Sequence, residues 1–359
     1  MNHPSEVEFR PLHIPADIDA DDAADFREMV RVRNDVYREI NGNDDDTIAP
    51  ATLLPMYRSD PDEIRKIWII VKSGEVIGRV GADIPLEEGS RVVFWLVEIL
   101  EDHHGQGIGS AAYRLVEETA REHGRTILQS WATQREAEGP RLEAPTGFGS
   151  LPDDHVARFF QKHGYTLEQV ERKSVFDPVA SSETVERLLQ DAEQKASGYR
   201  VIQWMAPTPA EYVPGYAWMK SRMSTDAPAA AMEFDEEKWD EARVRRHEER
   251  WKAAGIRVQI TVAQHIESGE LVAFNELAQE AEPTMPSSQW DTLVLKEHRG
   301  HKLGQLVKAA GLISWREIEP DAPKIITYNA EENRPMLDIN EALGFVPASY
   351  NGAWKKVLA

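Results

Sequence analysis

Hydrophobic and polar positions along the chain follow two spacings in turn, and each spacing predicts a different element. Short apolar runs such as residues 92–100 are typical of strands, whereas apolar residues recur at helical spacing in stretches such as residues 22–42. Strands are expected at residues 7–12, 67–72, 75–84, 91–100, 126–131, 199–204, 257–264, 271–277, 291–295, 324–328 and 353–357, with strand-like residues also leading up to position 176. Helices are expected at residues 22–42, 110–124, 153–163, 182–196, 212–223, 239–254, 304–317 and 333–343. This mixture predicts an α/β protein.

A glycine-rich loop connects the strand at residues 91–100 to the helix that follows it. Its residues are His104, Gly105, Gln106, Gly107, Ile108 and Gly109, and Ser110 continues into the helix. Glycines allow a sharp turn and a close backbone approach, and free N–H groups at a helix start can hold an anion. The spacing matches neither a dinucleotide fingerprint nor a P-loop. Taken alone, an ordinary strand-to-helix turn explains it more often than a ligand site does.

A second loop of the same kind indicates that the chain contains an internal duplication. It consists of Arg299, Gly300, His301, Lys302, Leu303 and Gly304, followed by Gln305. Gly105 and Gly300 are 195 positions apart, and the turns at residues 73–75 and 268–270 have the same offset. Gly164 and Gly344 are 180 apart, which leaves about fifteen extra residues in the first copy. We assign them to the Gly- and Pro-rich segment 139–152 and expect a mobile loop there.

Both loops resemble the motif of the GNAT superfamily of acetyl-coenzyme A dependent acyltransferases, which is Arg or Gln, two residues, Gly, one residue, then Gly or Ala. The first copy has His104 in place of Arg or Gln, and the second has Lys302 in place of the middle glycine. Downstream, Asn333 and the pair Gly344-Phe345 also fit the family. The resemblance implies two tandem GNAT domains, each a mixed twisted sheet flanked by helices, which is the plan of tandem members such as mycothiol synthase.

The resemblance also implies an acetyl-CoA site in each domain. The loops would hold the pyrophosphate through backbone N–H groups, and the fourth strand would pair with the pantetheine arm. The residues assigned to the cofactor are Val97, Ile99, His104, Gly105, Gln106, Gly107, Ile108, Gly109, Ser110, Leu293, Val294, Leu295, Arg299, Gly300, His301, Lys302, Leu303, Gly304, Gln305 and Asn333. The family tyrosine that often protonates the leaving thiolate is replaced by Phe160 and Asn340, so another group or water would have to supply that proton.

Three acids are candidates for the base that takes the amine proton. Glu276, late in the third strand of the second copy, and Asp291, early in the fourth, would face the thioester, and Glu98 is the corresponding candidate in the first copy. A structural hydrogen-bonding role in the sheet remains the alternative for each acid. We expect catalysis in the second domain, because Arg299, Asn333 and Gly344-Phe345 fit the family best.

The expected domain boundaries follow from the duplication. Residues 1–178 would form the N-terminal domain, residues 179–198 a connecting helix and linker, and residues 199–359 the C-terminal domain. Three consecutive acids at residues 44–46 are expected in a solvated loop, since the spacing of a calcium loop is missing.

Composition restricts the partners. The net charge of −21 disfavours a nucleic-acid partner and would suit a cationic amine, although acidity that only maintains solubility is the more common explanation. The absence of cysteine excludes disulfides and thiolate metal sites, and the loop histidines 103, 104, 298 and 301 do not form a zinc-ligand set, so we expect no metal. Without a secretory or membrane-spanning signal, we expect a cytoplasmic monomer or homodimer that acts on a small-molecule amine and does not bind membranes. The alternatives are a non-catalytic acyl-CoA sensor and an aminoacyl transferase of GNAT-like fold.

Overall fold

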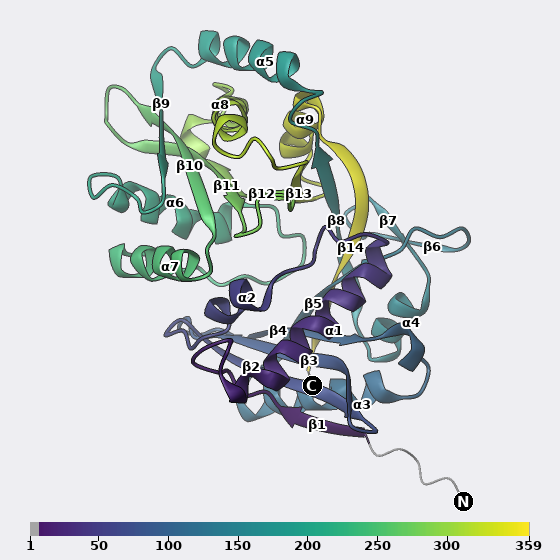
Figure 1. The fold of residues 1–359 in the computed structure, drawn as a ribbon. Coiled ribbons are helices and arrows are strands. Elements are labelled where there is room, and N and C mark those ends of the chain that lie inside the picture. Colours follow the sequence, from purple (N-terminus) through teal and green to yellow (C-terminus); the bar gives the residue numbers. More distant parts are fainter. Residues whose placement is uncertain (1–6, 359) are drawn as a thin grey trace, which may run out of the picture.

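One twelve-stranded sheet runs through both halves of the chain in the computed structural model, which describes residues 7–358 (Figure 1). The strand order is β1-β2-β3-β4-β5-β14-β8-β13-β12-β11-β10-β9. The first half supplies β1 (Val7–Pro11), β2 (Glu63–Lys72), β3 (Glu75–Pro85), β4 (Val92–Ile99), β5 (Ile127–Gln134) and β8 (Thr166–Phe176). The second half supplies β9 (Tyr199–Met205), β10 (Arg257–His265), β11 (Leu271–Gln279), β12 (Ser287–Val294), β13 (Ile325–Ala330) and β14 (Val346–Val357). The predicted mixture of strands and helices is confirmed.

Helices cover both faces of this sheet. They are α1 (Ala24–Asn41), α2 (Pro50–Met56), α3 (Ile108–Glu122), α4 (His155–Lys162) and α5 (Ser182–Lys195), then α6 (Val213–Asp226), α7 (Glu241–Ala253), α8 (Leu303–Ile318) and α9 (Arg334–Leu343). In β2, Ile70 packs in the core cluster beneath α3, whereas its neighbours Ile69 and Val71 pack beneath α1. Because successive strand residues point to opposite faces, α1 and α3 lie on opposite sides of the sheet. No helix within residues 7–358 is both long and apolar enough to cross a membrane.

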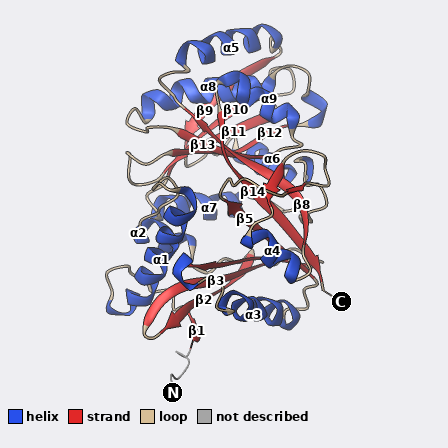
Figure 2. Ribbon diagram, turned by 90° about the vertical axis from the view of Figure 1, so that its right-hand side faces the viewer, coloured by secondary structure: helices blue, strands red, loops and turns tan. Residues whose placement is uncertain are grey.

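The two halves interlock through their last strands. Strand β14, from the end of the chain, lies between β5 and β8, and β8 in turn pairs with β13 of the second half (Figure 2). Ala353 of β14, for example, is registered with Trp131 of β5. Thus β14 joins the second half to β5, the fifth strand of the first half, and β8 joins the first half to β13, the fifth strand of the second half. The boundary proposed near residue 198 divides the sequence, while the sheet continues across it.

The internal duplication is visible in the pairing register. Gly78 pairs with Ile99 between β3 and β4, and Ala273 pairs with Val294 between β11 and β12, so both strands keep the offset of 195 positions. Further along, the register shifts between Asn275 and Leu277, because two residues of β12 there oppose Glu276 alone. Beyond that bulge the offset in the fourth strand becomes 194, and Ser288 is the counterpart of Phe94.

Several segments differ from the sequence-based expectation. Helix α2 was not predicted, and β14 begins at Val346 rather than at residue 353. Residues 139–152, expected as a mobile loop, contain the hairpin strands β6 (Arg141–Glu143) and β7 (Ser150–Pro152), and Leu151 is fully buried. Among the acidic residues 44–46, expected in a solvated loop, Asp45 reaches the second half and pairs with Lys324 at 2.8 Å, and Asp46 pairs with Lys173 of β8 at 2.6 Å. Hydropathy marks such acids as exposed, but it does not report ion partners that lie far away in the sequence.

Candidate active site

The two glycine loops have almost the same backbone. His104 and Arg299 both have φ −68° and ψ 160°, and the residues before the helices, Gly107 and Lys302, both adopt left-handed conformations with φ 82° and φ 56°. A lysine in this region costs about 1 kcal/mol relative to glycine. The two loops therefore occupy equivalent places in their sheets, as the shared offset predicts.

The residue that opens each loop makes the same contact. His104 Nε2 lies 2.7 Å from the carbonyl oxygen of Ile99, and Arg299 Nε donates to the carbonyl oxygen of Val294 at 3.2 Å. The contact requires the Nε2–H form of His104, because a carbonyl can only accept. Histidine thus replaces the usual arginine without loss of this loop contact.

The start of each loop helix offers unused hydrogen-bond donors. Within residues 7–358, the backbone N–H groups of Ile108, Gly109 and Ser110 have no acceptor, and neither do those of Leu303, Gly304 and Gln305. These amides and the positive end of the helix dipole fit a pyrophosphate. The cofactor role of these residues stays a prediction.

In each half, the fourth and fifth strands separate before the chain reaches the glycine loop. β4 pairs with β5 only at residues 92–94, and β12 pairs with β13 only at Ser287 and Ser288. Where the strands begin to separate, a hydroxyl of the fifth strand still bonds to the fourth strand. Ser130 donates to the carbonyl oxygen of Trp95 at 2.7 Å, and Thr327 donates to that of Gln289 at 3.2 Å. Val97, Ile99, Leu293, Val294 and Leu295 lie beyond these points. Strands that separate in this way can accommodate an extended chain such as pantetheine.

The second loop has a neighbour of its own. Helix α5 packs against the start of α8, where Lys302 pairs with Asp191 and Gln305 donates to the carbonyl oxygen of Leu188 at 2.7 Å. The hydrogen bond from Lys302 lowers the pKa of Asp191. His298, expected among the loop histidines, lies with its Nδ1 3.0 Å from the hydroxyl of Tyr199. The positive charge of Lys302 is thus matched by a carboxylate, while Arg299 forms no ion pair within residues 7–358.

The two acids predicted in the second half share one buried lysine. Lys220 of α6 donates to Glu276 at 3.2 Å and to Asp291 at 2.5 Å, and the hydroxyl of Tyr216 also donates to Glu276. Burial alone would lower the pKa of Lys220, but the two carboxylates outweigh it and raise that pKa. Glu276 is 1% exposed, and burial raises its pKa even though Lys220 opposes the shift.

The two acids differ in access. The side chain of Asp291 is 35% exposed, and its Oδ1 accepts no hydrogen bond within residues 7–358. Asp291 also belongs to the β-bulge opposite Glu276, which turns it away from the regular ladder. Asp291 is therefore better placed to meet a substrate, while Glu276 lies behind Lys220.

The acid predicted as the base of the first half is more constrained. Glu98 receives two hydrogen bonds from Arg79, at 2.6 and 2.9 Å, so both of its carboxylate oxygens are occupied. Arg79 also donates to the hydroxyl of Tyr57 at 2.6 Å. This closed, bidentate pair has the form of a structural ion pair.

At the positions of the family tyrosine, the halves differ again. Phe160 is stacked on Trp354 of β14, with ring centroids 4.8 Å apart. Asn340 instead accepts a hydrogen bond from Lys308 at 2.9 Å. Lys308 of α8 is 1% exposed, and burial lowers its pKa to about 7. Sequence reasoning missed Lys308 and Lys220, although Lys308 interrupts the apolar face of a predicted helix and could have been noticed there.

Asn333, the remaining residue predicted at the cofactor, precedes α9. Its backbone carbonyl accepts hydrogen bonds from Met336 and Leu337 at 3.0 Å each, while its side chain does not cap the helix. The side-chain amide is thus left available to another partner.

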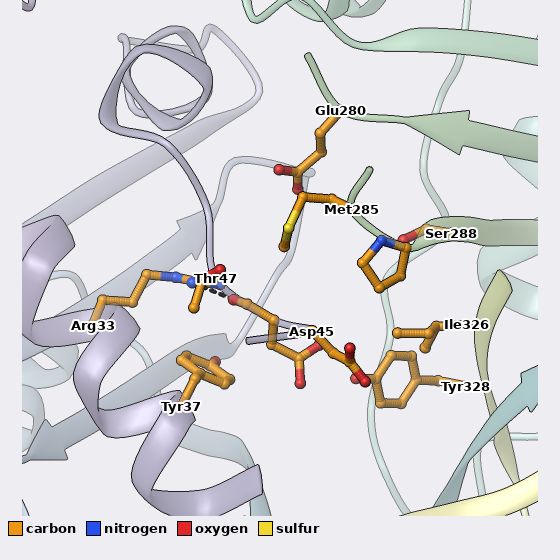
Figure 3. A pocket seen from close by; sticks show the side chains of 11 residues that line it. Arg33, Tyr37, Asp45, Thr47, Glu280, Met285, Ser288, Ile326 and Tyr328 are labelled. Atoms are coloured by element: carbon orange, nitrogen blue, oxygen red, sulfur yellow. Dashed lines mark hydrogen bonds between the residues drawn. The ribbon is translucent and has the colours of Figure 1, made fainter. Parts of the chain in front are cut away.

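A cavity of about 230 Å³ lies where the halves meet (Figure 3). The first half lines it with side chains of α1 and of the loop after α1, and the second half with residues at the end of β11 and at the starts of β12 and β13. The lining residues are Arg33, Tyr37, Asp45, Asp46, Thr47, Glu280, Met285, Pro286, Ser288, Ile326 and Tyr328. Tyr328 stands beyond the last paired residues of β12 and β13, so the cavity reaches the split between these strands.

The equivalent surface of the first half is covered. Phe94, Gln129 and Trp131 there correspond to Ser288, Ile326 and Tyr328. Phe234, from the segment between α6 and α7, stacks on Phe94 with centroids 6.0 Å apart and lies 6.1 Å from Trp131. Gln129 binds both backbone groups of Glu233, at 2.6 and 2.8 Å. The segment of the second half that contains Glu233 and Phe234 thus covers this surface of the first half. The equivalent surface of the second half borders the cavity.

Comparisons with known proteins agree with this architecture. Residues 28–139 match the model of the acetyltransferase (GNAT) family. A solved tandem GNAT protein from the clavulanic acid biosynthesis pathway has a TM-score of 0.72 and 23% identity over 98% of both chains. A GCN5-related N-acetyltransferase from Sphaerobacter thermophilus has a TM-score of 0.62 and 14% identity over 98% of this chain and 95% of the other. No curated protein gives a significant match.

A third similar structure is the glucosamine N-acetyltransferase region of a fungal multi-domain GH3 β-N-acetylglucosaminidase, with a TM-score of 0.64 and 14% identity over 99% of this chain and 38% of that one. At these identities the structural comparisons establish the fold. Residues 28–139 match the acetyltransferase (GNAT) family, and the two halves of the chain together have the fold of a tandem GNAT protein.

Proposed function

We propose that the protein transfers an acetyl group from acetyl-CoA to an amine of a small molecule, and that the second half carries out this reaction. The observation that carries the assignment is the cavity at the split between β12 and β13, because its counterpart at β4 and β5 is filled by Phe234. The family match lies in the first half, so the assignment of catalysis rests on the geometry of the second.

Acetyl-CoA supplies the acetyl group as an activated thioester. The unused amides of Leu303, Gly304 and Gln305 would hold its pyrophosphate, and the separated strand β12 would accept the pantetheine arm. The first loop offers the same donors in Ile108, Gly109 and Ser110. We therefore expect acetyl-CoA to bind at both loops.

The proton of the attacking amine would pass to the free Oδ1 of Asp291, while Lys220 holds the other carboxylate oxygen. The new bond joins the amine nitrogen to the acetyl carbon as the carbon–sulfur bond breaks. Lys308 would then protonate the thiolate, because a pKa of about 7 leaves part of its population charged at neutral pH. Phe160 cannot donate a proton, so in the first half another group or water would have to protonate the thiolate.

Amide replacements assayed across pH test this assignment. We expect Asp291→Asn to reduce kcat by about 100-fold, the usual effect of losing a general base, whereas Glu98→Gln should leave kcat within a few-fold of the parent. Glu276→Gln is expected to act through Lys220 and to shift the pH profile. If Asp291→Asn and Glu276→Gln both keep full turnover while Glu98→Gln loses it, the assignment to the second half is wrong.

The second candidate function is a non-catalytic acyl-CoA sensor. It is favoured by one observation, namely that neither Phe160 nor Asn340 can replace the acid that the family usually has. A sensor would bind acetyl-CoA without releasing thiol in the presence of any amine. Calorimetry combined with a thiol-release assay on an amine panel separates the two functions.

A further inference from the structure

The cavity between the halves contains one positive and one negative side chain that remain without an ion partner within residues 7–358. Asp45 and Asp46 line it too, but their charges are matched by Lys324 at 2.8 Å and Lys173 at 2.6 Å. Arg33 and Glu280 form no ion pair with each other or with any other described residue. A basic side chain and an acidic side chain, neither of them in an ion pair, therefore line the same cavity.

Arg33 is held ready for an anion. It donates through Nη1 to the carbonyl oxygen of Asp46 at 2.5 Å and to Asn34 at 2.9 Å, and its guanidinium lies 4.4 Å from the centroid of the Tyr37 ring. Its Nε and Nη2 groups donate to no acceptor within residues 7–358. A guanidinium that is fixed on one side and free on the other suits a carboxylate, which can accept two parallel hydrogen bonds.

Glu280 is placed at the other side of the cavity, directly after β11, while Arg33 enters from α1 (Figure 3). Its carboxylate receives no hydrogen bond from the rest of residues 7–358. Burial raises the pKa of this carboxyl, and Arg33 acts in the opposite direction. A partly buried acid without a donor is costly unless a cationic group meets it, and an ammonium group would do so.

We propose that this cavity binds an acceptor with an amino-acid head group, its carboxylate on Arg33 and its ammonium on Glu280, while a second, terminal amine extends toward the split beside Tyr328. This inference rests on the proposed function, since the terminal amine is the one that would be acetylated. Asp291, the proposed base, is absent from the lining of the cavity. Recognition and proton removal are thus assigned to different residues.

The experiment compares lysine and its two shorter homologues with analogues that lack one charged group. The matching diamines lack the carboxylate, and the matching ω-amino acids lack the α-ammonium group. We expect the parent protein to prefer each complete amino acid over both analogues by tenfold or more in kcat/KM, the effect of one charged hydrogen-bonded contact.

Two variants then address each charge separately. Arg33→Met should remove the preference over the diamines, and Glu280→Gln should remove the preference over the ω-amino acids. Glu267→Gln, in the exposed turn between β10 and β11, is the matched control and should keep both preferences. The inference is overturned if the parent shows no preference, or if the preferences persist in both variants.

Failure of the proposed function would look different, because no amine would then release thiol from acetyl-CoA. In that event, calorimetry with lysine and pentane-1,5-diamine still measures how strongly each compound binds to the cavity. Stronger binding of lysine that is lost in Arg33→Met would support the head-group site, and equal binding of the two compounds would refute it.

Discussion

The same face of the sheet meets different neighbours in the two halves. In the first half, Phe234 covers Phe94 and Trp131, and Gln129 holds the backbone of Glu233. In the second half, the loop after α1 reaches the corresponding surface but contributes Asp45 and Asp46, and a cavity of about 230 Å³ remains. The two halves have thus kept the same register, while in the first half the segment that contains Phe234 occupies the place that is a cavity in the second.

The two halves also differ in how deeply their ion pairs are buried, and substitutions in these pairs should have the largest effect on stability. Lys220→Met should lower the free energy of unfolding by about 3 kcal/mol or more, because Glu276 would be left buried without its cation. Arg79→Met should cost less, since the side chain of its partner Glu98 is 14% exposed and that of Glu276 only 1%. Urea denaturation measures both losses.

A double variant checks the cause. Lys220→Met combined with Glu276→Gln should recover most of the stability lost in the single variant, because no unpaired charge is then buried. Equal losses for Lys220→Met and Arg79→Met, or no recovery in the double variant, would show that charge burial does not distinguish the halves.

The next effect concerns Lys308, whose counterpart in the first half is Tyr113. Folding lowers the pKa of Lys308 from 10.5 to about 7, so the cost of burying its charge is complete below pH 7 and disappears above about pH 10.5. Lys308→Met should therefore stabilise the protein by a few kcal/mol at pH 6, and this gain should shrink steadily as the pH rises. Thermal unfolding from pH 6 to pH 10 records the trend.

Tyr113→Phe serves as the control in the first half. Burial raises the pKa of Tyr113 above its usual value, so its effect should not vary between pH 6 and pH 9. A gain in Lys308→Met that stays constant with pH would mean that the lysine is not buried in its charged form.

The smallest effect is expected from exchanging the residues before the loop helices. Lys302→Gly should raise the stability by less than about 1 kcal/mol, because relief of the left-handed lysine is partly offset by the lost pair with Asp191. Gly107→Lys should lower it by a similar amount. Calorimetry with acetyl-CoA should still give two binding sites in both variants, since Lys302 already occupies this conformation; loss of one site in Gly107→Lys alone would contradict the equivalence of the loops.

Local patterns in the sequence were sufficient for most of the elements and for the duplication, but they missed α2, β6 and β7. The offset between Gly105 and Gly300 reappears in the register of β3 with β4 and of β11 with β12, because turns and strands are specified by nearby residues. The placement of β14 beside β5 was not predictable in this way. Apolar alternation shows that a strand forms, but it does not show which strand, more than 200 positions away, will pair with it.

Side-chain partners were the harder part of the site. Glu276 and Asp291 could be named from their positions in strands, whereas their shared partner Lys220 lies on a helix, where a lysine usually indicates a solvated face. Phe234 lies in a segment without helix or strand, and nothing near it in the sequence indicates that it packs on Phe94. Contacts between halves depend on the assembled sheet and are absent from any local window.

The most direct test of the central claim is the rate of amine-dependent thiol release from acetyl-CoA by Ser288→Phe. This change places at β12 the side chain that Phe94 has at β4, and it should fill the cavity and reduce kcat/KM for the amine by about 100-fold or more while acetyl-CoA still binds. Phe234→Ala, which uncovers the first half, should not change that rate. If Ser288→Phe keeps its full rate and Phe234→Ala alters it, the reaction takes place in the first half and the account is contradicted.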